Sequence, residues 1–586
     1  MGGPVEAGRL QGGGGRLSAP RCVRVLPDVP AIDKTFDYLV PDALGDQVRV
    51  GTMVRIALAG RRVGGWVVED GVEPPPDKRL VALSKVTGWG PPPDLVDLAR
   101  WAAWRWAGRQ ATLLRTASPP LAVRGLPPAA PPRPPAAVVG EDDLVRDAFA
   151  RERAVVRLPP AVDPFPYIAA AAARGPALVL APSIARAAHV AGRLRRQGTT
   201  VALAPRDWAR AAAGGATVVG ARAGAWAPVP GLAAVVVLDA HDEVYQEERA
   251  PTWNAWQVAA ERARRAGVPC VLLSPCPTLD LLHWSEAIVP SRAQERSGWP
   301  AVDIVDRRQD DPRSGLYSER LVSALRGGGR VVCVLNRKGR ARLLACAACG
   351  ELARCTSCDG AVELDDDELR CRRCDTVRPV VCATCGAQRF KNLRAGVTRV
   401  REELEALAGA PVAEVTGESD EEPTAAILVG TEAVLHRVPQ ADVVAFLDID
   451  QEILVPRFRA AEQAMALLAR AARMVGGRGG RVLVQTRLPH HEVLTAALHA
   501  DPGRVVAAES ARRRALAFPP FSALALVSGE AADEYVAALP VHLDRLGPVD
   551  NRWLVRAPDH RTLCDGLAAT PRPGGRLRVE VDPLRA

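Results

Sequence analysis

Residues 346–385 read CAACGELARCTSCDGAVELDDDELRCRRCDTVRPVVCATC, and they hold eight cysteines arranged as four CxxC pairs. Two thiolates at this spacing can bind one metal ion from a single tight turn, and four thiolates complete a tetrahedral zinc site. The stretch therefore predicts two zinc ions in one insert. Disulfides are the alternative, but we expect no export signal in the Gly-rich residues 1–20, and disulfides are rare in proteins that stay inside the cell.

The gaps between successive CxxC pairs are five, twelve and seven residues, and these lengths indicate which pairs share an ion. A five-residue gap is a very short link between two pairs on one metal, whereas residues 359–370 are long enough for a two-stranded loop. We therefore expect the second and third pairs to share one ion, and the first and fourth pairs to share another around it. Both sites would have four protein ligands, which is typical of structural rather than catalytic zinc. The inner site consists of Cys355, Cys358, Cys371 and Cys374, and the outer site of Cys346, Cys349, Cys382 and Cys385.

Length and composition set limits on the rest of the chain. Its 586 residues are 48% hydrophobic, which allows three or four domains with cores of their own. No run of eighteen apolar residues occurs, so we expect no transmembrane helix and a cytoplasmic location. The net charge of +9 favours a polyanionic partner, with nucleic acid the first candidate. Lysine is scarce, and none lies between Lys85 and Lys338.

Three segments are expected before the larger domains. Residues 1–20 predict a disordered tail, and residues 21–118 predict a small β-rich domain with a hairpin that turns at residues 60–62. Residues 119–140 are rich in proline and alanine and predict a semi-rigid linker without regular structure.

A helix is expected at residues 94–107, where Asp94 can cap the first turn. Its apolar side chains recur at helical spacing, which favours a place in the core over stacking on bases. These side chains are Leu95, Leu98, Trp101 and Trp104.

Short apolar runs alternate with helical stretches further along, a pattern typical of parallel α/β sheets. They predict one lobe at residues 141–300 and a second at residues 301–490, with the zinc insert at residues 345–387. A smaller α+β domain is expected at residues 491–586. The strands are expected at residues 177–181, 199–204, 216–219, 233–238, 270–274, 330–335, 426–429, 443–448 and 481–486.

Several short segments surround the four CxxC pairs in a fixed order. They are TFDYL at 35–39, VLNRKG at 334–339, GT at 430–431, FLDID at 446–450, FRAAE at 458–462, FPPF at 518–521 and VDP at 581–583. Together with the two tandem lobes, they resemble the PriA family of bacterial replication-restart proteins (primosomal protein N-prime), as a divergent member of the actinobacterial type. The resemblance implies an α/β multidomain fold: a β-rich DNA-binding domain, two RecA-like lobes with the double-zinc insert in the second, and a small α+β C-terminal domain.

The motor motifs of that family are degraded in this chain. The segment in place of the P-loop, residues 157–165, reads RLPPAVDPF and offers neither glycine nor lysine to phosphates. The acidic motif keeps Asp239 but has Ala240 beside it, and the arginine motif keeps Arg470 and Arg473 without its glycines. Those arginines are expected to be DNA-backbone contacts, surface residues or relic arginine fingers. No catalytic residue is assigned, and ATP is a doubtful cofactor.

The resemblance also implies a pocket for the 3′ end of a DNA strand in the N-terminal domain. In that pocket Phe36 would stack on the terminal base, and Asp37 would accept hydrogen bonds from the sugar or the base edge. Gly60 would let the backbone approach the DNA.

Two features depart from the family. The lysine of its pocket is replaced by Val81, so Lys78 or Arg79 would have to substitute for it. The winged-helix domain that precedes lobe one is expected to be absent, because only residues 119–140 remain for it.

Three functional hypotheses follow. The first is a non-enzymatic protein that recognises stalled or abandoned replication forks and promotes reloading of the replicative helicase at the nucleoid. Its partners would be branched DNA, other primosome components, the replicative helicase or its loader, and single-strand-binding protein. The second is an ATP-dependent 3′–5′ DNA helicase with a divergent nucleotide site, which the absence of lysine from lobe one disfavours. The third is a zinc-ribbon adaptor of RNA or transcription, which the ordered segments disfavour.

Overall fold

The chain forms two compact units, Met1–Arg100 with Arg109–Leu126 (unit 1) and Trp101–Gly108 with Pro127–Ala586 (unit 2). The tail expected at residues 1–20, residues 136–140 of the expected linker, and Lys78 lie outside the described residues. The computed structural model describes residues 21–29, 32–73, 79–131, 133, 135, 143–310, 316–335, 344–365, 368–371, 374–392, 397–415 and 424–585.

Unit 1 is built on a five-stranded antiparallel sheet in the order β2-β1-β4-β3-β5. A bridge between Leu39 and Ala82 continues the sheet beyond β2, because Leu39 N–H donates to the carbonyl oxygen of Val81 at 3.0 Å. The strands are β1 (Cys22–Pro27), β2 (Phe36–Leu39), β3 (Met53–Leu58), β4 (Arg61–Asp70) and β5 (Lys85–Gly88), and a 3₁₀ turn, η1 (Asp42–Gln47), lies between β2 and β3.

The two-residue period of the strands sets which side chains enter the core of unit 1. Val23 and Val25 on β1 and Tyr38 on β2 are buried, whereas Arg24 and Asp37 lie between them on the opposite face. The sheet therefore carries an apolar inner face and a charged outer face.

Two helices follow the sheet, α1 (Pro93–Arg105) and α2 (Gln110–Ala117). Leu95 and Leu98 are buried as expected, but Trp101 is only half-buried and Trp106 is the fully buried tryptophan. The expected stripe was wrong at this end because the helix stops at Arg105, two residues short of the range expected, so Trp106 enters the core from a non-helical turn. The described residues 118–131 that follow α2 contain no helix or strand.

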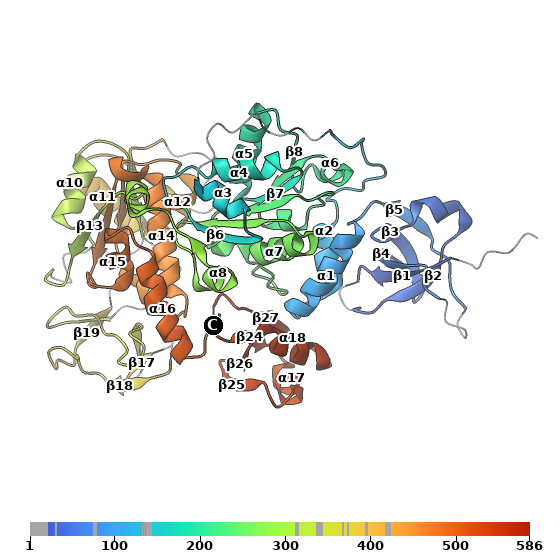
Figure 1. The fold of residues 1–586 in the computed structure, drawn as a ribbon. Coiled ribbons are helices and arrows are strands. Elements are labelled where there is room, and N and C mark those ends of the chain that lie inside the picture. Colours follow the sequence, from blue (N-terminus) through green and yellow to red (C-terminus); the bar gives the residue numbers. More distant parts are fainter. Residues whose placement is uncertain are drawn as a thin grey trace, which may run out of the picture. The chain divides into compact units, whose positions relative to one another are not determined.

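Lobe one is a seven-stranded parallel sheet in the order β12-β6-β11-β10-β7-β9-β8. Helices α3, α4 and α5 pack into one core cluster on one face, and α7 covers the other (Figure 1). The strands are β6 (Arg153–Arg157), β7 (Ala177–Leu180), β8 (Val201–Leu203), β9 (Thr217–Gly220), β10 (Ala234–Val237), β11 (Cys270–Ser274) and β12 (Ala287–Ile288). The helices are α3 (Asp143–Phe149), α4 (Phe165–Ala173), α5 (Ile184–Arg196), α6 (Trp208–Ala213), α7 (Ala255–Ala266), α8 (Leu279–Trp284) and α9 (Arg292–Ser297).

Lobe two is a six-stranded parallel sheet in the order β13-β23-β22-β14-β21-β20. Its strands are β13 (Ala301–Asp306), β14 (Val331–Val334), β20 (Val412–Val415), β21 (Ile427–Gly430), β22 (Val443–Phe446) and β23 (Arg481–Thr486). Its helices are α10 (Glu319–Arg326), α11 (Val397–Ala408), α12 (Ala433–Arg437), α13 (Asp450–Ile453), α14 (Ala460–Met474), α15 (Glu492–Leu498) and α16 (Gly503–Ala515). Apolar residues of α15 and α16 belong to the core of lobe two, so this lobe continues past the boundary expected at residue 491.

The cysteine insert and the C-terminal domain complete unit 2. The insert consists of a two-stranded sheet, β15 (Leu344–Cys346) with β19 (Phe390–Asn392), and a three-stranded sheet, β16 (Val362–Asp365), β17 (Glu368–Cys371) and β18 (Val377–Pro379). The C-terminal domain is an antiparallel sheet, β25 (Asp544–Val549), β26 (Arg552–Ala557), β24 (Ala523–Ser528) and β27 (Arg578–Val581), with α17 (Ala532–Ala538) and α18 (His560–Ala569). Among the described helices, none has the length and apolar character that a membrane crossing requires.

Candidate functional site

The eight thiols of the insert form two clusters of four, and the Sγ atoms of each cluster lie within 4.8 Å of one another. The clusters are the inner and outer groups that the loop lengths suggested. Sγ atoms are 3.5 Å apart for Cys346 and Cys385, 3.6 Å for Cys349 and Cys382, 3.5 Å for Cys355 and Cys374, and 3.5 Å for Cys358 and Cys371.

Each CxxC turn closes on a residue with positive φ, which explains the glycine or aspartate that follows every pair. The backbone N–H of that residue donates to the carbonyl oxygen of the first cysteine of its pair. The residues are Gly350 (φ 75°, 3.0 Å), Asp359 (φ 60°, 3.1 Å), Asp375 (φ 54°, 2.9 Å) and Gly386 (φ 75°, 3.0 Å).

Both clusters fit a closed metal site. Zn–S bonds of about 2.3 Å in a tetrahedron place sulfurs about 3.8 Å apart, close to the spacings found here. Four thiols leave no position for a reacting ligand, so the sites can stabilise the insert but not activate water. The insert is also tied to lobe two, because Arg487 donates to the carbonyl oxygen of Gly350 at 3.1 Å and Ala361 N–H to that of Leu454 at 3.1 Å.

The loop after β6, at the place expected for a P-loop, offers few backbone N–H donors. Pro159, Pro160 and Pro164 have no N–H. Two further donors of the loop are bonded inside the protein: Ala161 N–H bonds to the carbonyl oxygen of Gly298 at 3.2 Å, and Phe165 N–H, at the start of α4, bonds to Asp163 Oδ1 at 3.1 Å. The N-terminus of α4 is therefore capped by a carboxylate of the chain where an anion would otherwise bind.

Arg473 of lobe two forms an ion pair with Asp239, the residue kept from the acidic motif of lobe one. It donates to both carboxylate oxygens of Asp239, at 2.5 and 2.7 Å, and through Nε to the carbonyl oxygen of Pro160 at 3.1 Å. Burial alone would raise the pKa of Asp239, but the charge of Arg473 lowers it below its usual value. The carboxylate that would meet a nucleotide-bound metal is therefore neutralised by protein.

Arg470, one helical turn away on α14, makes a second contact of the same kind. It pairs with Asp242 of lobe one and, at 3.1 Å, with Glu432 of lobe two. The two arginines are therefore contacts between lobes, which none of the roles expected from sequence had included. The cavity that remains beside Asp239 is about 10 Å³, lined by Leu158, Pro164, Arg186, Leu238, Asp239, Leu273, Ser274, Pro275 and Arg473.

The structure places the proposed DNA-end residues on the sheet of unit 1. Phe36 shares the face of Tyr38 and packs partly against the core, whereas Asp37 lies on the outer face. Gly60 has φ +76° in the β3–β4 turn, and a Cβ there would meet no atom within 4 Å. Tyr38 Oη donates to the carbonyl oxygen of Ala57 at 2.9 Å, which links β2 to the end of β3 before this turn.

Of the two cations that the sequence suggested for that pocket, Lys78 lies outside the described residues and only Arg79 is described. Val81, which is 54% exposed, borders β2 through its bond to Leu39, and Arg79 is exposed. Sequence reasoning missed two further cations, Arg24, which pairs with Asp37, and Lys34, whose Nζ lies over the Phe36 ring. Only the cross-strand register, which pairs Arg24 with Asp37, reveals the first of them.

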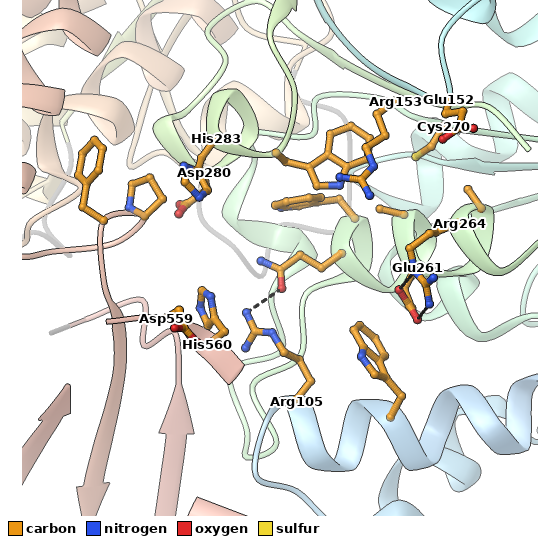
Figure 2. Close-up of a pocket in the computed structure, with 18 of the residues that line it drawn as sticks. Arg105, Glu152, Arg153, Glu261, Arg264, Cys270, Asp280, His283, Asp559 and His560 are labelled. Atoms are coloured by element: carbon orange, nitrogen blue, oxygen red, sulfur yellow. Dashed lines mark hydrogen bonds and ion pairs between the residues drawn. The ribbon is translucent and has the colours of Figure 1, made fainter. Parts of the chain in front are cut away.

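Unit 2 also contains a cavity of about 690 Å³ that joins the end of α1 to lobe one and the C-terminal domain (Figure 2). Arg105 and His560 both line this cavity and both contact Asp582. Arg105 Nη2 lies 2.7 Å from Asp582 Oδ2, and His560 Nε2 lies 2.7 Å from Asp582 Oδ1. Both charges lower the pKa of Asp582, although burial alone would raise it. Sequence reasoning missed this cavity because its walls come from opposite ends of the chain. Its aromatic lining consists of Trp101, Trp256, Trp284 and Phe521.

Comparison with known proteins identifies the family. A family model described as the 3′DNA-binding domain (3′BD) of PriA matches residues 24–119. A protein of Mycobacterium tuberculosis named probable replication restart protein PriA is 30% identical, over 90% of this chain and 91% of its own length. The chain belongs to the PriA family.

Other relatives show how the likeness to PriA proteins is distributed. The probable replication restart protein PriA of Mycobacterium leprae is 29% identical over 94% of both chains. The replication restart protein PriA of Bacillus subtilis is 28% identical over 56% of this chain and 45% of its own length. The mycobacterial PriA proteins thus match this chain over at least 90% of its length, whereas the Bacillus PriA matches it over 56%.

Proposed function

We propose that this chain is a non-hydrolysing DNA-binding protein of replication restart. It recognises stalled or abandoned replication forks and promotes reloading of the replicative helicase. Support comes from its membership of the PriA family and from the match of residues 24–119 to a 3′DNA-binding domain. Phe36, Asp37 and Gly60 form the proposed contact with a DNA 3′ end, at which the free end rather than base sequence is recognised.

The contact between Arg473 and Asp239 carries the non-hydrolysing part of the proposal. In a nucleotide-driven motor, the space between the lobes must admit a triphosphate and a metal ion. Here arginine already pairs with the carboxylate, and the adjoining cavity of about 10 Å³ holds no more than a water molecule. The loop before α4 contains three prolines without N–H, and its Ala161 and Phe165 N–H groups are bonded inside the protein, which disfavours phosphate binding.

A steady-state ATPase assay with fork DNA tests this reading. We expect turnover indistinguishable from the blank, at least a hundredfold below the roughly 10 per second typical of enzymes. The Asp239→Ala variant should give the same trace. Turnover above background that Asp239→Ala abolishes would instead support the second hypothesis, an ATP-dependent 3′–5′ helicase with a divergent site.

The zinc insert and the protein partners complete the proposal. Two zinc ions hold the insert against lobe two as a structural module. The partners we propose are other primosome components, the replicative helicase or its loader, and single-strand-binding protein, in the cytoplasm at the nucleoid. Affinity for DNA rests on arginine–phosphate contacts and therefore falls steeply as salt rises.

A further inference from the structure

Arg24 is an unexpected member of the site around Asp37. It lies on β1 opposite Asp37 on β2 and Glu69 on β4. Its Nε donates to Asp37 Oδ1 at 2.8 Å, its Nη2 lies 3.4 Å from Asp37 Oδ2, and its Nη1 donates to Glu69 Oε2 at 2.7 Å. The guanidinium is therefore shared between two carboxylates, and the hydrogen bonds to Asp37 raise the pKa of Arg24.

The regular alternation of β1 places this arginine on the outer face. Val23 and Val25, on either side of Arg24, are both buried. The register between β1 and β4 does shift beside Arg24, but the extra residue is Val68 on β4, between the partners Glu69 and Val67. The side chains of Arg24 and Asp37 are 34% and 18% exposed, so the pair is fixed in orientation yet open to a solute.

This arrangement makes Asp37 favour a ligand that donates a hydrogen bond over a ligand that is an anion. An ionised carboxylate is an acceptor only, with about four lone-pair positions on its two oxygens. Arg24 takes one position on each oxygen and leaves the others for a ligand. A hydroxyl can donate to such a group, whereas a phosphate at the same place is repelled.

Arg24 itself is poorly placed to bind phosphate, because one positive charge already faces two carboxylates. Lys34 differs in this respect. It is exposed, its Nζ lies 5.4 Å from the centre of the Phe36 ring, and no carboxylate in the described part of the chain forms an ion pair with it. A phosphate near Phe36 would therefore meet Lys34 first.

We propose that Arg24 is a positioning residue, which holds Asp37 for the terminal 3′-hydroxyl of a DNA strand, and that Lys34 contacts the strand's phosphate backbone. The inference rests on the proposed function, because it assumes that a strand end is the ligand. It adds Arg24 as the group that orients the carboxylate of Asp37, and Lys34 as the positive charge that contacts the DNA backbone.

Binding of the full chain to two forks tests the inference. The forks differ only in the leading-strand end, a 3′-hydroxyl or a 3′-hydrogen (dideoxy), and affinity is measured by fluorescence anisotropy over a range of salt. We expect the wild type to prefer the hydroxyl roughly tenfold, the worth of one hydrogen bond to a charged group. In Arg24→Gln the preference should fall to about twofold or less, and Arg24→Lys should retain part of it. The control Arg21→Gln breaks a comparable ion pair with Asp70 next to the same strand and should leave the preference unchanged.

Salt dependence separates the two cations. The slope of log affinity against log salt should stay the same in Arg24→Gln and become shallower by about 0.7 to 0.9 in Lys34→Gln, the loss of one phosphate contact. Thermal melting checks that each variant is folded. If Arg24→Gln does not fold, Arg24→Lys is used in its place.

The outcomes distinguish the inference from the function on which it rests. A folded Arg24→Gln that keeps the tenfold preference, or whose salt slope becomes shallower, overturns the positioning role alone. If the wild type binds forks without preferring the hydroxyl end, both the 3′-end pocket and the role of Arg24 are refuted. Fork recognition itself would still stand. A wild type that does not bind forks refutes the proposed function itself.

Discussion

At the residue scale, Asp239 of lobe one is a buried carboxylate that an arginine of lobe two holds. Its side chain is 11% exposed and would be an unpaired buried charge without Arg473. Removing one partner of a fully buried pair typically costs 3–5 kcal/mol. Because the side chain of Arg473 is 39% exposed, water can replace part of the lost interaction.

We therefore expect Arg473→Gln to lower the free energy of unfolding by about 2 kcal/mol at pH 7, measured by denaturant titration. Arg473 lowers the pKa of Asp239 in the folded protein, so the pair stabilises the fold above the ordinary pKa of 3.8 and loses this effect as pH falls below it. The gap between wild type and variant should thus be constant from pH 8 to about pH 5 and narrow below about pH 4. The control Arg481→Gln breaks a pair with Asp303 within lobe two whose arginine is 61% exposed, and it should cost less than about 1 kcal/mol. A gap that widens in acid would contradict the assignment of Asp239 as the ionised partner.

At the element scale, the strands that sequence predicted well are those whose physical signal is local. Residues 270–274 and 481–486 coincide with β11 and β23, because continuous apolar runs mark buried parallel strands. Strands β6 and β13 were missed, since arginines at both ends of β6 and aspartates in the middle and at the end of β13 interrupt the apolar run. The pairing of Arg24 with Asp37 and the large cavity of unit 2 could not be predicted, because both depend on which distant segments become neighbours.

The nested thiol clusters are an element-scale feature that metal analysis can test directly. Purified wild type should contain about two zinc ions per chain. The double variant Cys346→Ser/Cys382→Ser changes only the outer cluster and should retain one zinc, whereas Cys346→Ser/Cys355→Ser damages both clusters and should retain none. Sequential pairing of the CxxC motifs would reverse these two results. Mass spectrometry of the metal content decides between them.

At the scale of the whole molecule, the two lobes contact each other through polar side chains at several points. Besides Arg473 with Asp239, Leu279 N–H of lobe one donates to Glu462 Oε1 of lobe two at 2.7 Å. Arg459 of lobe two pairs with Asp280 of lobe one at 2.8 Å. These contacts involve only protein groups, and they add to the ion pairs of Arg470 and Arg473 across the lobes.

This arrangement predicts how the lobes respond to ATP and to loss of the arginines. In hydrogen exchange with mass spectrometry, residues 157–165 and 239–243 of the wild type should exchange at the same rate with and without Mg-ATP, because the site has no room for it. In Arg470→Gln/Arg473→Gln both segments should exchange faster, since the ion pairs that cover them are gone, while the insert at residues 346–385 should not change. The control Arg481→Gln should leave all three segments unchanged, because its ion pair lies within one lobe. Slower exchange of residues 157–165 on addition of Mg-ATP to the wild type would show that nucleotide binds between the lobes. The two lobes would then be a motor that still closes on its ligand.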